Sequence, residues 1–574
     1  MTRLLLFLAL AASASAQPPA DSTLAPADSV AAPDPSAEAL EAVPSGPFDA
    51  TPAALAGVIW TAPEDDDAAV QDLRAMRQAG IRIVRTGLVT EAVLSEADRL
   101  GISIAQELPV ADLPASRLAA AMGGAEQLLT EALALARPHA SARTFILARG
   151  VDTSDRASRA YFERLTEIVR ERGAPGTQTA YLTRFVDDDR AHETVDLVLL
   201  DARGRDPFTL LQRWRARHET PVGLGAWGEG VVPGREGGWR REGTLARQAR
   251  TAERTLDEFL TMRSPPAVAF LARWRDREER GVRAEVADLR YGLLDTENTP
   301  RPALDVVTGL YTGRQRVFAF DAGPPQSGLR SGLLVLIGWG LVLCLGALVT
   351  VSPRMSALVP QYFGRRDLYR EAIQKGYGLS GAVTVGLAAL LALTVGVVGA
   401  TVLRAFAATD ALAVATASWE GEAQTRMVRL VGAPALLGIL VAALYSAWLL
   451  LNVVWVGVLA GRRQRMRPVQ ALSLVVWTRW PWIILLIGAM LVASLPPASA
   501  GLWAGVLVIA ALIVETLAGW RTLVDLTYVG FVSQGKALGL GFAVPFVLLS
   551  IGAIVLLVIA GAEVAFLWHL AVRS

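Results

Sequence analysis

The chain has 574 residues, of which 52% are hydrophobic, and its 55 basic and 54 acidic residues give a formal net charge of +1. This balance gives no electrostatic reason to expect nucleic acid as a partner. The single cysteine, Cys344, excludes a fold held by intramolecular disulfides, so an exported domain would depend on its own hydrophobic core.

The N-terminal residues have the pattern of an export signal. Arg3 precedes an apolar run at 4–12, and Ala14-Ser15-Ala16 forms a small-residue cleavage site. Residues 17–47 contain seven prolines and no Lys or Arg, with too few large apolar groups to offset chain entropy by burial. We therefore predict a signal peptide at 1–16 and a disordered tether at 17–47.

Between 48 and 320, short β-branched or apolar runs alternate with amphipathic stretches such as 68–78, 156–170 and 245–260. The candidate strands are 56–60, 81–86, 102–106, 144–148, 178–182, 195–200, 222–224 and 267–270. Eight strand–helix units in about 270 residues match the number and size of a (β/α)8 TIM barrel. A doubly wound open sheet is the alternative fold, but no Gly-x-Gly-x-x-Gly turn follows the first strand, and no cofactor is predicted.

In a (β/α)8 barrel, functional groups lie on the loops at the C-terminal ends of the strands. Those positions carry Trp60, Arg85, Glu107, Asp152, Arg184, Asp201, Trp227, Glu229 and Trp274. Aromatic rings stack on the apolar faces of sugars, whose hydroxyls need polar partners, so this composition favours a carbohydrate ligand. The alternative is that any barrel rim is polar and that Trp60 or Trp274 only plugs the barrel.

Four segments in this region carry a resemblance to a known family. Residues 72–86 have the pattern of a helix followed by the second strand, and residues 97–109 that of the next such unit, which ends in Glu107 before a proline turn. Residues 274–276 and 291–303 include Trp-Arg-Asp, Tyr-Gly-Leu-Leu-Asp and Pro-Arg-Pro-Ala. Together, over most of 50–315, they resemble the barrel domain of glycoside hydrolase family 2, the β-galactosidase and β-glucuronidase group. The resemblance implies an (β/α)8 fold and a carbohydrate ligand.

Catalysis in that family uses a glutamate at the end of the fourth strand as acid/base and one at the end of the seventh as nucleophile. A retaining glycosidase needs these two carboxyl groups about 5 to 5.5 Å apart. Counted from His139-Ala-Ser141, which resembles the family's His-Pro-Ser, the acid/base position is Gly150, and within 221–228 the nucleophile position is Ala226. The resemblance therefore implies that both glutamates are replaced. Asp152 and Glu229 are the candidate catalytic groups, provided that loops return them to these positions.

Two further sets of charges at the rim have alternative interpretations. Arg85 and Glu107 match the family's second-strand arginine and third-strand acid, so they are candidate substrate-binding residues with Trp60, Trp227 and Trp274. Alternatively, they form an ion pair inside the barrel mouth.

The aspartates at 65–67 and 187–189 could suggest calcium. Consecutive residues rarely converge on one ion, and the first run is placed to favour a helix N-terminus. We therefore expect caps or solvated loops and predict no metal site.

From residue 331 to 572 the sequence consists of long apolar runs, each near the length of about 20 residues that crosses a bilayer. We predict an all-α domain with six transmembrane helices, at 331–351, 379–401, 430–460, 471–495, 499–520 and 539–570. There is no sign of an inverted repeat or of paired broken helices, which would favour a transporter. The membrane segments only weakly resemble Yip1-type domains.

The basic residues of the loops predict an orientation, because loops on the cytoplasmic side are rich in Lys and Arg. If residues 17–330 are exported, the loops after the first and third spans should be basic. Those loops contain Arg354, Arg365, Arg366, Arg370 and Lys375, and Arg462, Arg463, Arg465 and Arg467. The sequence therefore predicts a multi-pass protein of a bacterial inner membrane, with the barrel in the periplasm.

A few polar residues stand out within the apolar runs. Trp477, Trp480 and Trp482 around Arg479 are typical of an aromatic belt with a snorkelling cation at the interface. Glu515 and Glu563 could mark an ion or substrate path, because ionisable groups in spans are costly and usually functional. The alternative is that each glutamate lies near a span end.

Three functions follow from these observations. The first is a membrane-anchored, carbohydrate-binding pseudoenzyme whose partners are a glycan and the lipid bilayer. The second is an active retaining β-glycosidase that acts on envelope or imported glycans. The third is a transport or envelope-assembly component that uses the barrel as a scaffold. Turnover of glycosides separates the first two, and glycan binding separates the first from the third.

Overall fold

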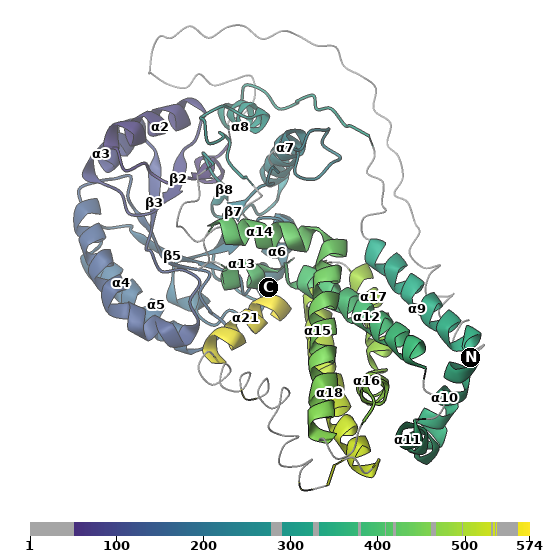
Figure 1. Cartoon of the computed structure of the whole chain (residues 1–574). Coiled ribbons are helices and arrows are strands. Elements are labelled where there is room, and N and C mark those ends of the chain that lie inside the picture. Colours follow the sequence, from purple (N-terminus) through teal and green to yellow (C-terminus); the bar gives the residue numbers. More distant parts are fainter. Residues whose placement is uncertain are drawn as a thin grey trace. The chain divides into compact units, whose positions relative to one another are not determined.

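The computed structural model describes residues 51–232, 234–276, 290–324, 332–376, 380–407, 409–416, 421–460, 466–495, 497–529, 532–533, 535, 551 and 561–573. The signal peptide predicted at 1–16 and the tether predicted at 17–47 lie outside these residues and stay predictions. Within the described residues, a barrel of strands and helices precedes a set of long apolar helices (Figure 1).

Eight parallel strands close into a barrel in which each strand pairs with its neighbours in sequence and β8 pairs with β1. The strands are β1 Gly57–Ile59, β2 Ile83–Thr86, β3 Ser103–Glu107, β4 Thr144–Arg149, β5 Gln178–Thr183, β6 Leu197–Asp201, β7 Val222–Trp227 and β8 Ala269–Leu271. Each lies within or close to a predicted run. The predicted closed barrel of eight parallel strands is therefore confirmed, and the open sheet is wrong. The predicted strand–helix alternation is interrupted once, because only the 3-10 helix His192–Thr194 lies between β5 and β6.

The helices of the barrel surround the strands (Figure 1). They are α2 Asp66–Gln78, α3 Glu91–Leu100, α4 Ala115–Ala136, α5 Ala157–Arg172, α6 Pro207–Arg215, α7 Leu245–Thr261 and α8 Pro302–Thr312. The first aspartate run begins α2: the Asp65 carboxylate accepts the backbone N–H of Ala68 at 3.1 Å, and Asp66 and Asp67 lie in the first turn. The negative charges stabilise this helix N-terminus, which confirms the expected cap.

The hydrophobic core of the barrel has an inner and an outer part. The inner part fills the space enclosed by the strands and contains Ala105, Ile146, Ala180, Leu182, Leu197, Leu199, Val268 and Phe270. The outer part packs the strands against the helices. Glycines in β7 face the inner part, because a Cβ on Gly223 would lie 2.6 Å from Val268 Cγ1 and one on Gly225 would lie 2.5 Å from Leu182 Cδ1. The glycines at the start of Gly-Leu-Gly-Ala-Trp-Gly are thus required by packing.

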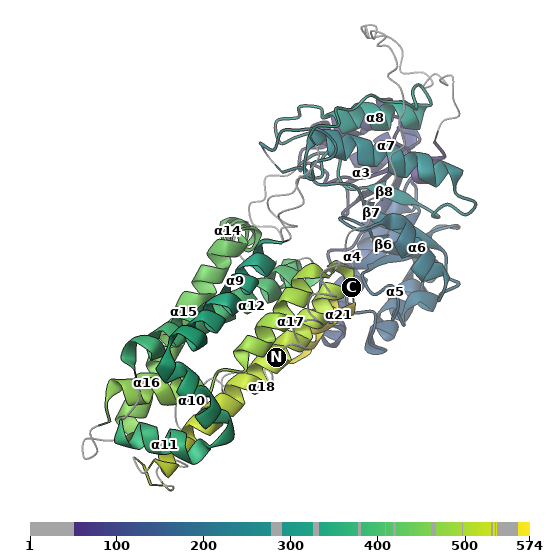
Figure 2. The same ribbon diagram turned by 90° about the vertical axis from the view of Figure 1, so that its right-hand side faces the viewer.

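The second half of the described chain is helical. Four helices are long and apolar enough to cross a membrane: α9 Leu333–Val351, α12 Gly381–Ala407, α15 Pro434–Ala460 and α18 Pro497–Tyr528. A fifth span results if α16 Pro468–Trp477 and α17 Trp482–Ser494, which meet at a 46° bend, are counted together. Figures 1 and 2 show α12, α15, α17 and α18 side by side, in agreement with their contacts.

These helices correspond to five of the six predicted spans. The sixth, at 539–570, falls largely outside the described residues, although its end overlaps α21 Gly561–Arg573. The interruption between α16 and α17 was not predicted. Shorter helices complete this half: α10 Pro353–Gly364, α11 Arg366–Lys375, α13 Asp410–Thr416 and α14 Gly421–Gly432.

Candidate functional site

A charged cluster lies at the end of the barrel where the parallel strands have their C-termini. We call it the mouth cluster; its members are Arg85, Glu107, Asp112, Arg149, Arg184, Asp201 and Arg203. Four of them belong to the last residues of β2, β3, β4 and β6, and the other three lie on the loops that follow β3, β5 and β6. This is the end at which barrels of this kind carry their binding and catalytic groups.

Arg85 crosses the inside of the barrel. Its Nε and Nη2 donate to Glu107 Oε2 at 2.9 and 2.6 Å, which confirms the ion pair considered as an alternative. Its Nη1 donates to the backbone oxygen of Gly225 at 2.6 Å. Because β1 and β8 separate β2 from β7 in the barrel, the Arg85 side chain has to span the interior to reach this oxygen. Arg85 is only 3% exposed, so its guanidinium group lies inside the barrel and is covered by other groups of the mouth.

The expected acid/base position, Gly150, is crowded by two charged side chains. Its φ is +62°, a left-handed conformation that disfavours residues with a Cβ. A Cβ built there would lie 2.6 Å from Asp112 Oδ1 and 3.3 Å from Arg184 Nε. Asp112 and Arg184 themselves form an ion pair at 3.4 Å. The place where the resemblance puts a catalytic carboxyl is thus filled by two other side chains.

Asp112 was not identified as a site residue from the sequence. The backbone N–H of Asp112 donates to Arg149 O, and the N–H of Arg149 donates to Val110 O, both at 2.9 Å, so the loop after β3 runs beside the end of β4. Asp112 has a φ of +53°, which is uncommon for a residue other than glycine. This backbone conformation places its carboxylate over Gly150.

The two candidate catalytic acids lie apart from this ion pair. Asp152 is 7% exposed and accepts hydrogen bonds from the backbone N–H of Ser154 at 3.2 Å and from its hydroxyl at 2.6 Å. The carboxylate of Glu229 lies 3.7 Å from Arg247 on α7 and lines a small cavity formed with residues of α7 and α8. Glu229 therefore lies on the helix side of β7, and no contact with Arg85 or Asp112 brings it into the mouth cluster.

Burial raises the pKa of Glu229 above its ordinary value, and the positive charge of Arg247 opposes this shift only in part. The opposite holds for Asp201 in the mouth. Burial alone would raise the pKa of Asp201, but Arg203, whose Nη2 lies 2.5 Å from Asp201 Oδ2, and Arg184 together lower it well below its ordinary value. Asp201 is therefore ionised at neutral pH and has no proton to give to a leaving group.

The three tryptophans proposed to stack on a sugar are packed in the wall of the barrel. Trp60 and Trp274 donate their Nε1–H groups to the two carboxylate oxygens of Asp72 on α2, at 3.0 and 3.4 Å. Trp227 packs edge-to-face on Phe259 of α7, with ring centroids 5.5 Å apart. All three are at most 2% exposed, so the structure leaves no ring face open to a ligand.

The second aspartate run, at 187–189, is only partly as expected. Asp187 forms surface ion pairs with Arg213 and Arg217, but Asp189 is 4% exposed and therefore does not lie in a solvated loop. Its carboxylate accepts hydrogen bonds from the Tyr181 hydroxyl at 2.6 Å and the Thr153 hydroxyl at 2.7 Å. Within the described part of the chain, no three His, Cys, Asp or Glu residues are grouped so that they could hold a metal ion.

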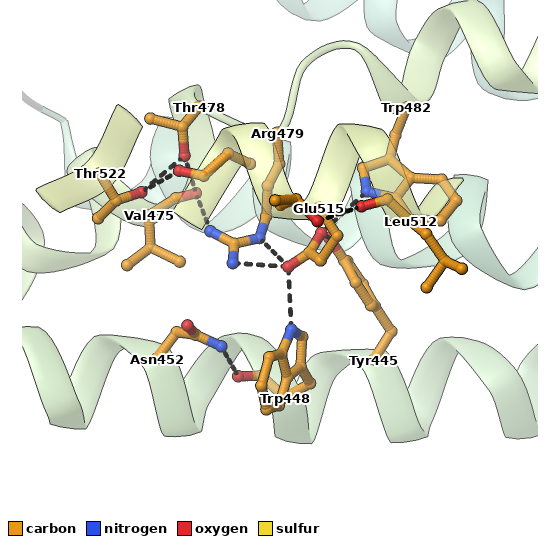
Figure 3. Close-up of polar contacts among 12 residues, drawn as sticks. Tyr445, Trp448, Asn452, Val475, Thr478, Arg479, Trp482, Leu512, Glu515 and Thr522 are labelled. Carbon is orange, nitrogen blue, oxygen red and sulfur yellow. Dashed lines mark hydrogen bonds and ion pairs between the residues drawn. The ribbon is translucent and has the colours of Figure 1, made fainter. Parts of the chain in front are cut away.

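A second charged site lies among the candidate membrane spans and is drawn in Figure 3. Glu515 is near the middle of α18, and its Oε1 accepts hydrogen bonds from Arg479 Nε at 2.8 Å, Arg479 Nη2 at 2.6 Å and Trp448 Nε1 at 2.9 Å. Its Oε2 accepts from the Tyr445 hydroxyl at 3.1 Å and Trp482 Nε1 at 3.2 Å. Arg479 is 1% exposed, so the prediction that it snorkels to the interface is wrong. The Glu515 carboxylate is thus held by donors from Arg479, Trp448, Tyr445 and Trp482.

Comparisons with known proteins give partial matches only. The sequence matches no family model, and no curated protein is significantly similar to it. Among solved structures, a β-glucuronidase from an uncultured Clostridium species is 17% identical, with a TM-score of 0.40 over 45% of this chain and 50% of that chain. A family 2 β-galacturonidase from Eisenbergiella tayi is 14% identical, with a TM-score of 0.41 over 47% of this chain and 53% of that chain.

A β-glucuronidase from Faecalibacterium prausnitzii gives similar values, with 16% identity and a TM-score of 0.41 over 47% of this chain and 50% of that chain. This chain thus spans about half the length of the structures that it matches. At these identities and TM-scores, function has to be inferred from the residues of the chain itself.

Proposed function

We propose that this protein is a membrane-anchored barrel that binds a carbohydrate at the mouth cluster without hydrolysing it. The observation that carries the proposal is the closed acid/base position: Gly150 is left-handed, and Asp112 and Arg184 occupy the space that a catalytic side chain would need. A barrel with this arrangement keeps a polar mouth at the functional end but has no glutamate at either position where the resemblance implies a catalytic carboxyl group.

The absence of hydrolysis follows from both expected positions. Ala226 has no functional group, and the nearby Glu229 is directed to α7. Asp152 is held by Ser154. Glu229 and Asp152 could act as a catalytic pair only if the loops after β7 and β4 both rearranged, and each rearrangement would have to break the packing or hydrogen bonds described above.

The ligand contacts that we propose come from the charged groups that keep an exposed edge. The side chains of Glu107, Arg149 and Arg203 are 17%, 27% and 13% exposed, respectively. They present both hydrogen-bond acceptors and donors, which suits the hydroxyl groups of a sugar. Arg85 fixes Glu107, while Trp60, Trp227 and Trp274 act by shaping the wall rather than by stacking.

The location that we propose is the periplasmic face of a bacterial inner membrane. The four or five candidate spans supply the anchor. The basic loops after the first and third spans favour export of the barrel, because such loops stay in the cytoplasm. Protease added to spheroplasts should then cleave the barrel and spare the loops around Arg365 and Arg463.

Glycan binding by the full-length protein in detergent tests the proposal. We expect the wild type to bind at least one oligosaccharide of a glycan panel, and Arg149→Gln to bind it about tenfold more weakly because a charged hydrogen bond to the ligand is lost. The matched control is Arg159→Gln, which removes the same charge from the exposed face of α5. The control should bind as the wild type does.

The same protein separates the alternatives. Hydrolysis of an unactivated disaccharide that is abolished in Glu229→Gln would establish the active glycosidase and overturn the proposal. Failure to bind any glycan, with the barrel folded, would support the scaffold role in transport or envelope assembly. We expect binding without turnover.

A further inference from the structure

A second concentration of arginine lies at the C-terminal end of α18, where it meets α10 and α11. Arg366 Nη2 and Arg370 Nε, both on α11, donate to the two carboxylate oxygens of Asp525 at 2.8 and 3.0 Å. Asp525 is completely buried. Arg521, one turn earlier on α18, lies with its guanidinium carbon 5.4 Å from the centre of the Tyr362 ring. We call Tyr362, Arg366, Arg370, Arg521 and Asp525 the basic cluster.

The positive charge of the basic cluster exceeds its negative charge. Three guanidinium groups face one carboxylate, so two positive charges are left without a buried counterion within the cluster. Arg370 also has Asp367 at 3.5 Å, but the Asp367 side chain is 98% exposed, and pairs of this kind contribute little because water screens them. An anion at this place would restore the balance.

The cluster also holds hydrogen-bond donors that lack acceptors. The Nε of Arg366, the Nε of Arg521 and the Tyr362 hydroxyl are buried, and none has a partner among the residues that the structure describes. Tyr362 is 1% exposed, and burial raises its pKa, so its hydroxyl remains a protonated donor at neutral pH. A buried donor without an acceptor destabilises the folded state. Several such donors in one place favour a ligand rich in oxygen acceptors.

The surroundings indicate that this ligand belongs to a lipid. The cluster lies at the end of the candidate span α18, and the ends of transmembrane helices lie at the level of the headgroups. Exposed apolar and aromatic side chains adjoin it: Phe363 is 55% exposed, Leu368 is 42% exposed, and Tyr528, whose ring lies 4.0 Å from the Arg370 guanidinium carbon, is 69% exposed. A free phosphate ion would leave these side chains uncovered, whereas acyl chains would cover them.

We propose that the basic cluster binds the phosphate group of an anionic phospholipid. Guanidinium groups bind phosphate oxygens through charge-assisted hydrogen bonds, and Asp525 holds Arg366 and Arg370 in position for this contact. The side chains of Arg366 and Arg370 are 28% and 17% exposed, so a headgroup can reach them from the surface. The proposal concerns the helical half alone and does not depend on what the barrel binds.

Lipid-dependent stability of the full-length protein tests this proposal. The protein is purified in a neutral detergent, phosphatidylglycerol or phosphatidylcholine is added, and the apparent Tm is measured for each. We expect phosphatidylglycerol to raise the apparent Tm more than phosphatidylcholine does, because a ligand that binds only the folded state stabilises it. Arg521→Gln should abolish this difference, and Tyr362→Phe should reduce it.

The matched control is Lys375→Gln on α11. It removes one positive charge from the same helix, but Lys375 pairs with the exposed Glu371 and is not a member of the basic cluster. The control should keep the difference between the two lipids. Because the readout is this difference, a general loss of stability in Arg521→Gln does not affect the result. Equal effects of the two lipids on the wild type, or an equal loss in Lys375→Gln and Arg521→Gln, would overturn the proposal. If inorganic phosphate alone reproduced the effect of phosphatidylglycerol, the site would take a soluble anion, and the lipid assignment would be wrong.

Discussion

Glu515→Gln is expected to destabilise the helical half strongly while changing its shape very little. The wild-type carboxylate accepts hydrogen bonds from Arg479, Trp448, Tyr445 and Trp482 (Figure 3). Glutamine fills the same volume but has no charge, so the guanidinium of Arg479, which is 1% exposed, would be left buried without a counterion. Removing one partner of a buried ion pair costs about 3 to 5 kcal/mol.

The double variant distinguishes a charge effect from a packing effect. Arg479→Met alone should cost about as much as Glu515→Gln, because it leaves the carboxylate buried and unpaired. Arg479→Met combined with Glu515→Gln leaves neither charge, so the double variant should be more stable than either single variant. If only packing mattered, the two losses would add.

Unfolding by SDS titration in mixed micelles measures these differences. The control is Glu371→Gln, which makes the same chemical change in an exposed pair with Lys375 and should shift stability by less than about 0.5 kcal/mol. If Glu515→Gln were no more destabilising than Glu371→Gln, or if the double variant were the least stable of the set, the buried ion pair would not be what holds these helices.

Three further predictions concern the barrel. Gly150→Ala should lose more stability than Gly101→Ala in thermal unfolding: both glycines are left-handed, which costs about 1 to 2 kcal/mol for alanine, but a Cβ at 150 would also collide with Asp112, whereas the space at 101 is open. Glu229→Gln should leave glycan binding within about tenfold of the wild type, since its carboxylate lies outside the mouth cluster. Arg99 and Arg74 hold the pKa of Glu96 at about 2, against an ordinary 4.5. The stability that these ion pairs contribute should therefore be complete above pH 4.5 and decline as the pH falls toward 2. Glu96→Gln should remove this part of the acid sensitivity.

The fold of the barrel could be predicted because each strand carries its own signal. The β-branched runs are short, turn residues bound them, and amphipathic helices separate them, so counting them was enough to choose a closed barrel. The same approach missed the break between α16 and α17. The short segment Thr478–Pro481 is not apolar, but the apolar residues on both sides of it dominate an average over the whole span, and such an average does not detect a bend. Arg479 and Pro481 were the local signs of an interruption.

The ion pair of Arg85 and Glu107 could also be predicted, because both residues end neighbouring parallel strands and their side chains therefore meet. Asp112 could not. It lies in a loop, and its position depends on a left-handed φ that aspartate adopts only occasionally. The directions of the Trp227 and Glu229 side chains could not be predicted for a different reason. The register of β7 shifts between Leu224 and Trp227, so simple alternation along the strand no longer tells which side a residue faces.

The charged groups of the mouth lie beside residues 150 and 226, the positions at which the resemblance implies catalytic glutamates. Arg85 reaches across to the backbone of Gly225, next to the expected nucleophile position, and Asp112 with Arg184 occupies the space beside Gly150. A glutamate at 150 would have to displace the Asp112 carboxylate, which is ion-paired with Arg184, and adopt a left-handed backbone conformation. The charged groups of the mouth are thus held in ion pairs with one another. Charged groups that are held in ion pairs can still bind a ligand through hydrogen bonds at the exposed edges of Glu107 and Arg149. They do not suit a reaction in which a carboxyl group must release a proton and take it back.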